Sequence, residues 1–146
     1  MKILGISLGH DSNFALVEDG KITAMMEAER LFRQKRYKLS AQTLAPGKYK
    51  STYQYVDIED LNRFLDIVRK EWGSAFDAVS VQNQGRTEEY NNLLSVLKEK
   101  GFSWKDAHHV NHHLSHAALS YFTSPFEDSL VLSYDGIGND GRTVFF

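Results

Sequence analysis

The beginning of the chain alternates between apolar and polar positions in three short runs, which is the pattern of half-buried β-strands. Polar turns separate the runs, and the second turn, Asp19-Gly20, is a strong β-hairpin signal. Two tight turns are enough to join three neighbouring antiparallel strands. We therefore predict such strands over residues 3–8, 13–18 and 21–28.

Beyond these strands the apolar residues recur three and four positions apart, which is the spacing of amphipathic helices. Helices are predicted over residues 57–72, from 87 or 88 to 101, and 112–121. Short apolar runs between and after them predict strands at 76–82, within 105–111, at 128–134 and from 142 onward. The charged segment 27–38 and the Pro-Gly segment 39–56 predict loops.

Three antiparallel strands followed by alternating helices and strands are typical of the ribonuclease-H-like α/β plan, which actin, sugar kinases and heat-shock ATPases share. We predict a mixed sheet with flanking helices, in one lobe that spans residues 1–146. The sequence stops inside an apparent strand at Val144-Phe145-Phe146, and this plan normally uses two lobes. We therefore expect an incomplete N-terminal lobe of a longer protein.

Composition narrows the class of protein without naming a function. The 146 residues carry a net charge of −2 and include no cysteine. A nearly neutral chain without a basic stripe argues against nucleic acid as a partner, and the lack of cysteine excludes disulfides and thiolate ligands. The first apolar run is too short for a signal peptide, and no run is long enough to span a bilayer. We expect a cytoplasmic protein with no membrane partner.

Candidate chemistry gathers in the histidine-rich segment 108–116, which holds five of the six histidines. If Asn111 caps a helix, the imidazoles of His112 and His116 project from one face, one turn apart. Such a pair is a natural grip on a divalent metal, and Asp135 after the next apolar run could supply an oxygen ligand. The alternative is a polar helix end whose histidines contact water.

Two further groups of polar residues are candidates for a site. In the first turn, Gly9 lets a ligand approach the backbone, and His10, Asp11 and Ser12 supply polar groups; the alternative is a plain polar hairpin. Arg33 and Lys35 could hold a phosphate or a carboxylate. The alternative for them is a solvated charged loop, and charge alone does not decide.

Four blocks of the sequence, residues 3–20, 27–35, 111–126 and 135–138, resemble the O-carbamoyltransferases of the nodulation-factor and cephamycin (NodU/CmcH) type. The blocks lie toward both ends of the chain and in the right order, so together they are more specific than any one alone. The resemblance implies a first lobe similar to that of the threonylcarbamoyl-adenosine synthases.

The resemblance also implies roles for individual residues. His112, His116 and Asp135 match the ligands of a metal, which is iron in such proteins, although these ligand types also suit zinc or manganese. His10 matches a general base for the acceptor hydroxyl, since histidine can accept a proton near neutral pH. The remaining matches are to substrate-binding or phosphate-binding positions, namely Asp11, Arg33, Lys35, Gly136 and Gly138.

The implied reaction makes a carbamoyl-adenylate from carbamoyl phosphate and ATP and passes the carbamoyl group to an acceptor alcohol. The sequence does not name that alcohol. The fragment alone is expected to be inactive, and an interrupted core would favour homo-oligomers. Two alternatives remain open at this point, namely an enzyme of the tRNA threonylcarbamoylation kind and a non-catalytic module that binds metal or nucleotide.

Overall fold

The computed structural model describes residues 1–41, 58–83, 87–133 and 144–145. Within them the chain forms seven strands and four helices. The strands are β1 (Lys2–Ser7), β2 (Asn13–Glu18), β3 (Lys21–Glu27), β4 (Ala78–Gln82), β5 (Asp106–His109), β6 (Leu132–Ser133) and β7 (Val144–Phe145). The helices are α1 (Ala28–Phe32), α2 (Ile58–Trp72), α3 (Thr87–Glu99) and α4 (His112–Phe122).

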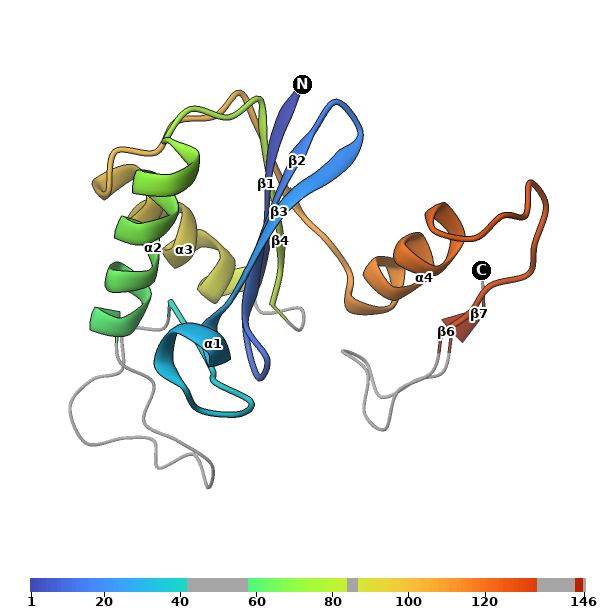
Figure 1. The fold of residues 1–146 in the computed structure, drawn as a ribbon, viewed down its shortest axis with the longest axis horizontal. Coiled ribbons are helices and arrows are strands. Elements are labelled where there is room, and N and C mark those ends of the chain that lie inside the picture. The colour runs from blue at the N-terminus through green and yellow to red at the C-terminus, as the bar shows by residue number, and fades with distance from the viewer. Residues whose placement is uncertain (42–57, 84–86, 134–143, 146) are drawn as a thin grey trace.

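Five strands form one mixed sheet in the order β3-β2-β1-β4-β5. The pairs β1–β2 and β2–β3 are antiparallel, whereas β4 pairs parallel to both β1 and β5. Helices α2 and α3 cover one face of this sheet, and α4 leads away from the other side (Figure 1). The predicted mixed α/β sheet with flanking helices is confirmed, and the arrangement is consistent with a ribonuclease-H-like lobe.

The core lies between the sheet and helices α2 and α3. Alternate strand residues point into it and are buried, among them Leu4, Ile6, Phe14, Leu16, Val79 and Val81. Phe64 of α2 packs on Phe14 of β2 with ring centroids 4.9 Å apart, and both side chains are fully buried. Each such side chain stabilises the fold by about 1.5–3 kcal/mol, so this face anchors the sheet.

Backbone conformation confirms the predicted Asp19-Gly20 hairpin and shows how α2 ends. Asp19 and Gly20 both have positive φ, 50° and 77°, as a two-residue type I′ hairpin requires. Gly73 follows α2 with φ of 81°, and its N–H donates to the carbonyl of Arg69 at 3.0 Å. A glycine in this conformation ends a helix without the steric cost that a Cβ atom would add.

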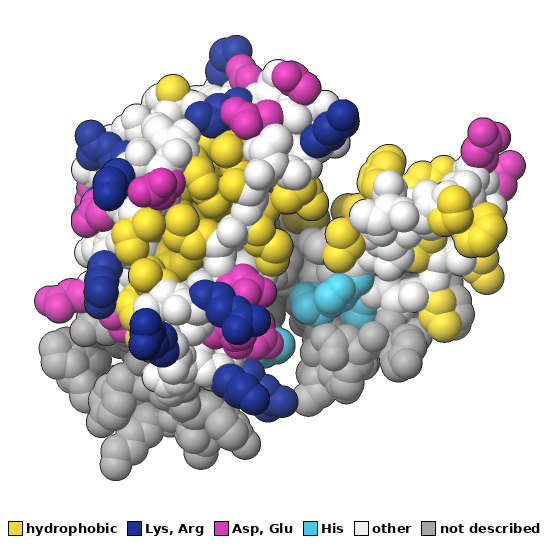
Figure 2. Space-filling view, viewed as in Figure 1, with side chains coloured by type: hydrophobic (Ala, Val, Ile, Leu, Met, Phe, Trp, Pro, Cys, Tyr) yellow, Lys and Arg dark blue, Asp and Glu magenta, His cyan; other side chains and the backbone are white. Residues whose placement is uncertain are grey.

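Two predicted segments differ from the structure. Part of the charged segment 27–38 is not loop but the helix α1, whose single turn is too short for helical periodicity to be visible in sequence. The buried strand predicted at 128–134 was also wrong, because only Leu132–Ser133 are in strand within the described part of that range. Leu130 is 81% exposed and Leu132 52%. Exposed apolar side chains gather on the α4 side of the molecule (Figure 2).

None of the described helices combines the length and the apolar character that crossing a membrane requires.

Asp77 joins three segments where β4 approaches the start of β1. Its Oδ2 accepts the Lys2 backbone N–H at 2.8 Å, and its Oδ1 accepts from Lys105 Nζ at 2.7 Å. The hydrogen bond from Lys105, together with the Lys2 N–H and the Lys105 charge, lowers the pKa of Asp77 below its ordinary value. The ionised carboxylate is therefore favoured by the folded chain.

Asp77→Asn should make stability less sensitive to acid. A carboxyl group with a lower pKa in the folded state stabilises the fold above its ordinary pKa, and this contribution is lost as pH falls through the folded value. We expect wild type to have the higher urea midpoint at pH 7, and the difference from Asp77→Asn to shrink below about pH 4. An equal difference at pH 7 and in acid would contradict this role.

Candidate functional site

The candidate residues gather at one edge of the sheet, where the parallel strands β1, β4 and β5 end. His10 lies in the turn after β1, Gln82 is the last residue of β4, and His112 follows β5 and begins α4 (Figure 1). Ligands of α/β proteins bind outside the carboxyl ends of parallel strands, because loops from separate strands meet there. The topology therefore makes this edge the expected place for a site.

The turn after β1 is fixed by Ser12, which is buried. Its hydroxyl donates to the carbonyl of Gly9 and accepts the backbone N–H of Leu39 at 2.8 Å. Gly9 has φ of 116° and Asp11 has φ of 58°, so the turn is sharply bent. The buried Ser12 side chain thus stabilises the turn from the protein interior. Of the three polar residues predicted to face a ligand, only His10 and Asp11 are exposed.

His10 and Asp11 form a hydrogen-bonded pair at the tip of this turn. Nδ1 of His10 lies 2.6 Å from Oδ2 of Asp11, and the two side chains are 68% and 54% exposed. A carboxylate only accepts, so Nδ1 carries the proton and Nε2 of the neutral ring keeps its lone pair. In the structure the Asp11 carboxylate orients His10, and the contact with substrate or phosphate that the resemblance implied for Asp11 stays a prediction.

The structure brings His112 and His116 together on one side of α4. The side chain of Asn111 caps the helix by accepting the Leu114 N–H at 3.1 Å, which fixes the first turn. Nε2 of His112 lies 3.2 Å from Nε2 of His116, and the ring centroids are 4.5 Å apart.

The separation of these nitrogens suits a shared metal. Two imidazoles bound to one ion at about 2.1 Å each have nitrogens about 3.0–3.4 Å apart, depending on the coordination angle. The separation in α4 falls within that range. Neutral imidazole is a good ligand for iron, zinc and manganese alike, so the donor chemistry fits the metal that the resemblance implies.

The predicted third ligand cannot be placed, since Asp135, Gly136 and Gly138 lie outside the described residues. Across the ranges that the structure does describe, no group of three or more His, Asp or Glu side chains converges as a metal site would require. The metal site thus stays a prediction that rests on the His112–His116 pair.

The neighbouring histidines have other partners. His113 is 1% exposed and its Nδ1 lies 2.9 Å from the Ser133 hydroxyl of β6, so it ties α4 to that strand. His109 lies 2.5 Å from Oδ1 of Asn83 and stacks on Tyr90 with centroids 4.7 Å apart. Within the histidine-rich segment, His112 and His116 therefore form a pair, whereas His113 and His109 each contact a different part of the fold.

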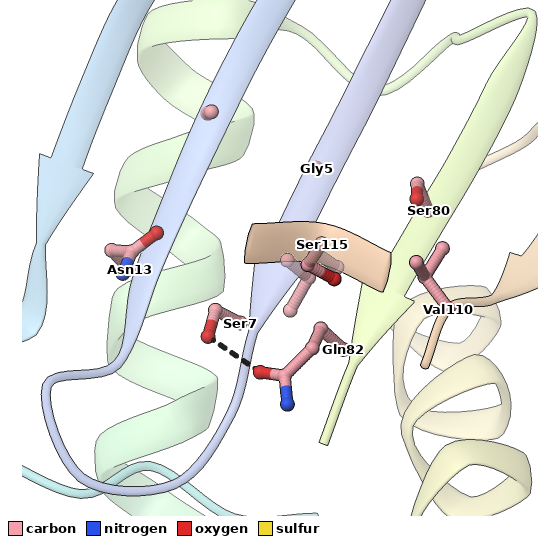
Figure 3. Close-up of a pocket in the computed structure, with 9 residues that line it drawn as sticks. Gly5, Ser7, Asn13, Ser80, Gln82, Val110 and Ser115 are labelled. Atoms are coloured by element: carbon pink, nitrogen blue, oxygen red, sulfur yellow. Dashed lines mark hydrogen bonds between the residues drawn. The ribbon is translucent and has the colours of Figure 1, made fainter. Parts of the chain in front are cut away.

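Sequence reasoning missed Gln82. Its Oε1 accepts a hydrogen bond from the Ser7 hydroxyl at 2.9 Å (Figure 3). Its Nε2 lies 3.0 Å from Nδ1 of His112. The only signal in the sequence was its position as the final residue of the strand predicted at 76–82. A polar residue at that place lies at the edge where the site is expected.

Arg33 and Lys35 are exposed in the turn that follows α1, where Arg33 takes a positive φ of 53°. The segment that follows them packs on the turn after β1, since Ser12 N–H donates to the Tyr37 carbonyl at 3.1 Å. The two cations therefore lie just before the segment that packs on the His10 turn, and their exposed side chains are accessible to an anion.

Comparison with known proteins identifies the family of the chain. A family model described as carbamoyltransferase N-terminus matches residues 74–146, the half of the chain that holds the His112–His116 pair. An uncharacterized protein of Synechocystis is 31% identical over 161 aligned residues, covering 97% of this chain and 26% of that protein.

Two nodulation proteins of Sinorhizobium fredii are also similar. Nodulation protein NolNO is 30% identical with 89% of this chain and 20% of the relative covered, and nodulation protein U is 28% identical with 93% and 27% covered. The chain thus spans 20% to 27% of the length of these relatives. By the family model, which matches half of its residues, the chain belongs to the carbamoyltransferase family, within that family's N-terminal region.

Proposed function

We propose that this chain supplies the transfer site of an ATP- and metal-dependent carbamoyltransferase, which moves a carbamoyl group from carbamoyl phosphate through carbamoyl-adenylate to an acceptor hydroxyl. The observation that carries the proposal is the joint presence, at one sheet edge, of an exposed His–Asp pair and a His112–His116 pair with metal-ligand spacing. The relatives span several times the length of this chain, so the activity is proposed for the full-length protein.

His10 is suited to act as the general base. Asp11 accepts a hydrogen bond from Nδ1–H of His10 and thereby leaves the Nε2 lone pair available to solvent, where an acceptor alcohol can approach. As the alcohol oxygen attacks the carbamoyl carbon, its proton passes to Nε2 of His10 and the bond to the adenylate phosphate breaks, releasing AMP. Asp11 also stabilises the imidazolium that results, because the two groups then carry opposite charges.

His112 and His116 would hold the metal, with Asp135 as the predicted oxygen ligand. A bound divalent ion supplies positive charge beside the phosphate oxygens, on which negative charge builds up as AMP leaves. The helix cap at Asn111 fixes the start of α4, so the two histidines already lie close together before the ion binds. This preorganisation favours binding over a pair of flexible side chains.

Arg33 and Lys35 complete the proposal as anion-binding groups. Both substrates are phosphates, and guanidinium and ammonium groups are the usual protein partners of phosphate oxygens. Because the segment that follows them packs on the His10 turn, they are suited to bind carbamoyl phosphate or ATP near that turn.

Radiolabelled carbamoyl phosphate provides the test. The full-length protein, incubated with ATP, Fe(II) and a panel of sugars and other alcohols, should place label in a carbamate ester and release AMP in equal amount. Omitting ATP should stop both. Label transfer that proceeds without ATP, or ATP consumption that ignores carbamoyl phosphate, would contradict the proposed reaction.

A further inference from the structure

A chain of side-chain hydrogen bonds links the centre of the sheet to the metal-ligand pair. Ser7 of β1 and Gln82 of β4 are register partners on adjacent parallel strands, and their side chains point toward each other (Figure 3). The Ser7 hydroxyl donates to Gln82 Oε1 at 2.9 Å, and Gln82 Nε2 lies 3.0 Å from His112 Nδ1. Beyond this, His112 Nε2 lies 3.2 Å from His116 Nε2.

This chain decides which nitrogen of His112 carries a proton. The amide nitrogen of Gln82 can only donate, so Nδ1 of His112 accepts and the proton of the neutral ring sits on Nε2. From there it can be donated toward His116 Nε2, which then accepts. In this tautomer, however, His112 has no lone pair on Nε2 with which to bind a metal.

Metal binding through Nε2 requires the opposite arrangement. Nδ1 must carry the proton and donate it to an acceptor, which a half-turn of the Gln82 amide provides by exchanging Oε1 for Nε2. The amide group has nearly the same shape in both orientations. Ser7 tolerates the exchange because a hydroxyl both donates and accepts, so it can receive the turned Nε2–H.

The surroundings leave room for that rotation. A cavity of about 210 Å³ lies on the sheet face opposite α2 and α3, and Ser7, Gln82 and Ser115 are among the residues that line it (Figure 3). Among the described residues, the strand positions that face the amide across the cavity include Gly5 and Ser80, whose side chains are small.

We propose that Gln82, supported by Ser7, is a positioning residue that switches His112 between a metal-free tautomer and a metal-binding one. This inference rests on the proposed metal site at His112 and His116. Hydrogen bonds to the second nitrogen of a ligating histidine fix its tautomer and orientation, and losing one typically weakens metal binding by about 10–100-fold.

Two variants of Gln82 separate positioning from packing. Gln82→Leu keeps a side chain of similar size but offers no acceptor to Nδ1 of His112, so the metal-free full-length protein carrying it should bind Co(II) about 10–100-fold more weakly than the protein carrying Gln82→Glu. Gln82→Glu supplies a permanent acceptor, so Co(II) should bind at least as tightly as to wild type. Ser80→Ala, in the same cavity but outside the hydrogen-bond chain, is the control and should bind as wild type does.

The histidine tautomer gives a readout that needs no metal. Nitrogen-15 ring shifts of His112 in the metal-free protein should report a proton on Nε2 in wild type and on Nδ1 in Gln82→Glu. A proton that stays on Nε2 in Gln82→Glu would overturn the inference. Equal Co(II) affinity in Gln82→Leu and Gln82→Glu would also overturn it, when thermal unfolding shows both variants to be folded.

Failure of the proposed function has a different signature. If wild type binds no Co(II), or if His112→Ala binds it as tightly as wild type, the metal site is wrong. The ring shifts still decide the role of Gln82 in that case, since a Nδ1 proton in Gln82→Glu supports control of the tautomer and an unchanged shift rejects it.

Discussion

Replacing His112 by alanine should abolish both retention of the divalent metal and carbamoyl transfer in the full-length protein. The variant removes one of two imidazole nitrogens that lie 3.2 Å apart and leaves a single histidine ligand on α4. One imidazole cannot hold an ion in the fixed position that charge stabilisation at the phosphate requires. Metal content by elemental analysis and label transfer from carbamoyl phosphate measure the two losses on the same sample.

His108→Ala is the matched control for this prediction. His108 is an exposed residue of β5 in the same histidine-rich segment, outside the pair on α4. Its variant should keep metal and activity. Full metal content and full transfer in His112→Ala would reject the assignment of the pair, whereas equal losses in both variants would point to general damage.

The second large effect is expected at His10. His10→Ala should lower the rate of transfer to an alcohol by about 10²–10⁴-fold, the usual contribution of a positioned general base. The metal should be retained, because His10 lies in the β1–β2 turn and not on α4. Single-turnover release of AMP in the presence of an alcohol that wild type carbamoylates isolates this step from formation of the adenylate.

Asp11→Asn tests the same role of His10 with a smaller expected loss of the transfer rate. An amide can still contact His10 but no longer favours the Nδ1 proton or stabilises the imidazolium, so the loss should be smaller than for His10→Ala. A transfer rate unchanged in His10→Ala would show that another group accepts the proton. A rate lost together with the metal would show that His10 acts on the metal site.

The sequence was most informative where the signals are local. Alternation predicted β1 to β3, the Asp19-Gly20 turn followed from its residue types, and Asn111 capped α4 as expected. Each of these depends on residues within a few positions of one another. The pairing of His112 with His116 could be anticipated for the same reason, because one turn of helix fixes it.

Features that depend on distant partners escaped prediction. Gln82 and His112 are separated by 30 positions and meet only because β4 and β5 pair in parallel, so that both chains end at one edge. For the apolar run at 128–134, the sequence instead predicted burial that the structure does not show. Its composition indicated burial, but a single strand does not reveal which surface would cover it, and Leu130 is exposed.

The central claim is that His112 and His116 bind one metal ion together. Anomalous diffraction from crystals of the full-length protein grown with Fe(II) or Mn(II) locates that ion directly. The account predicts a single peak about 2.1 Å from Nε2 of both histidines, with Asp135 as an oxygen ligand. A metal bound elsewhere, or in contact with only one of the two rings, would contradict it.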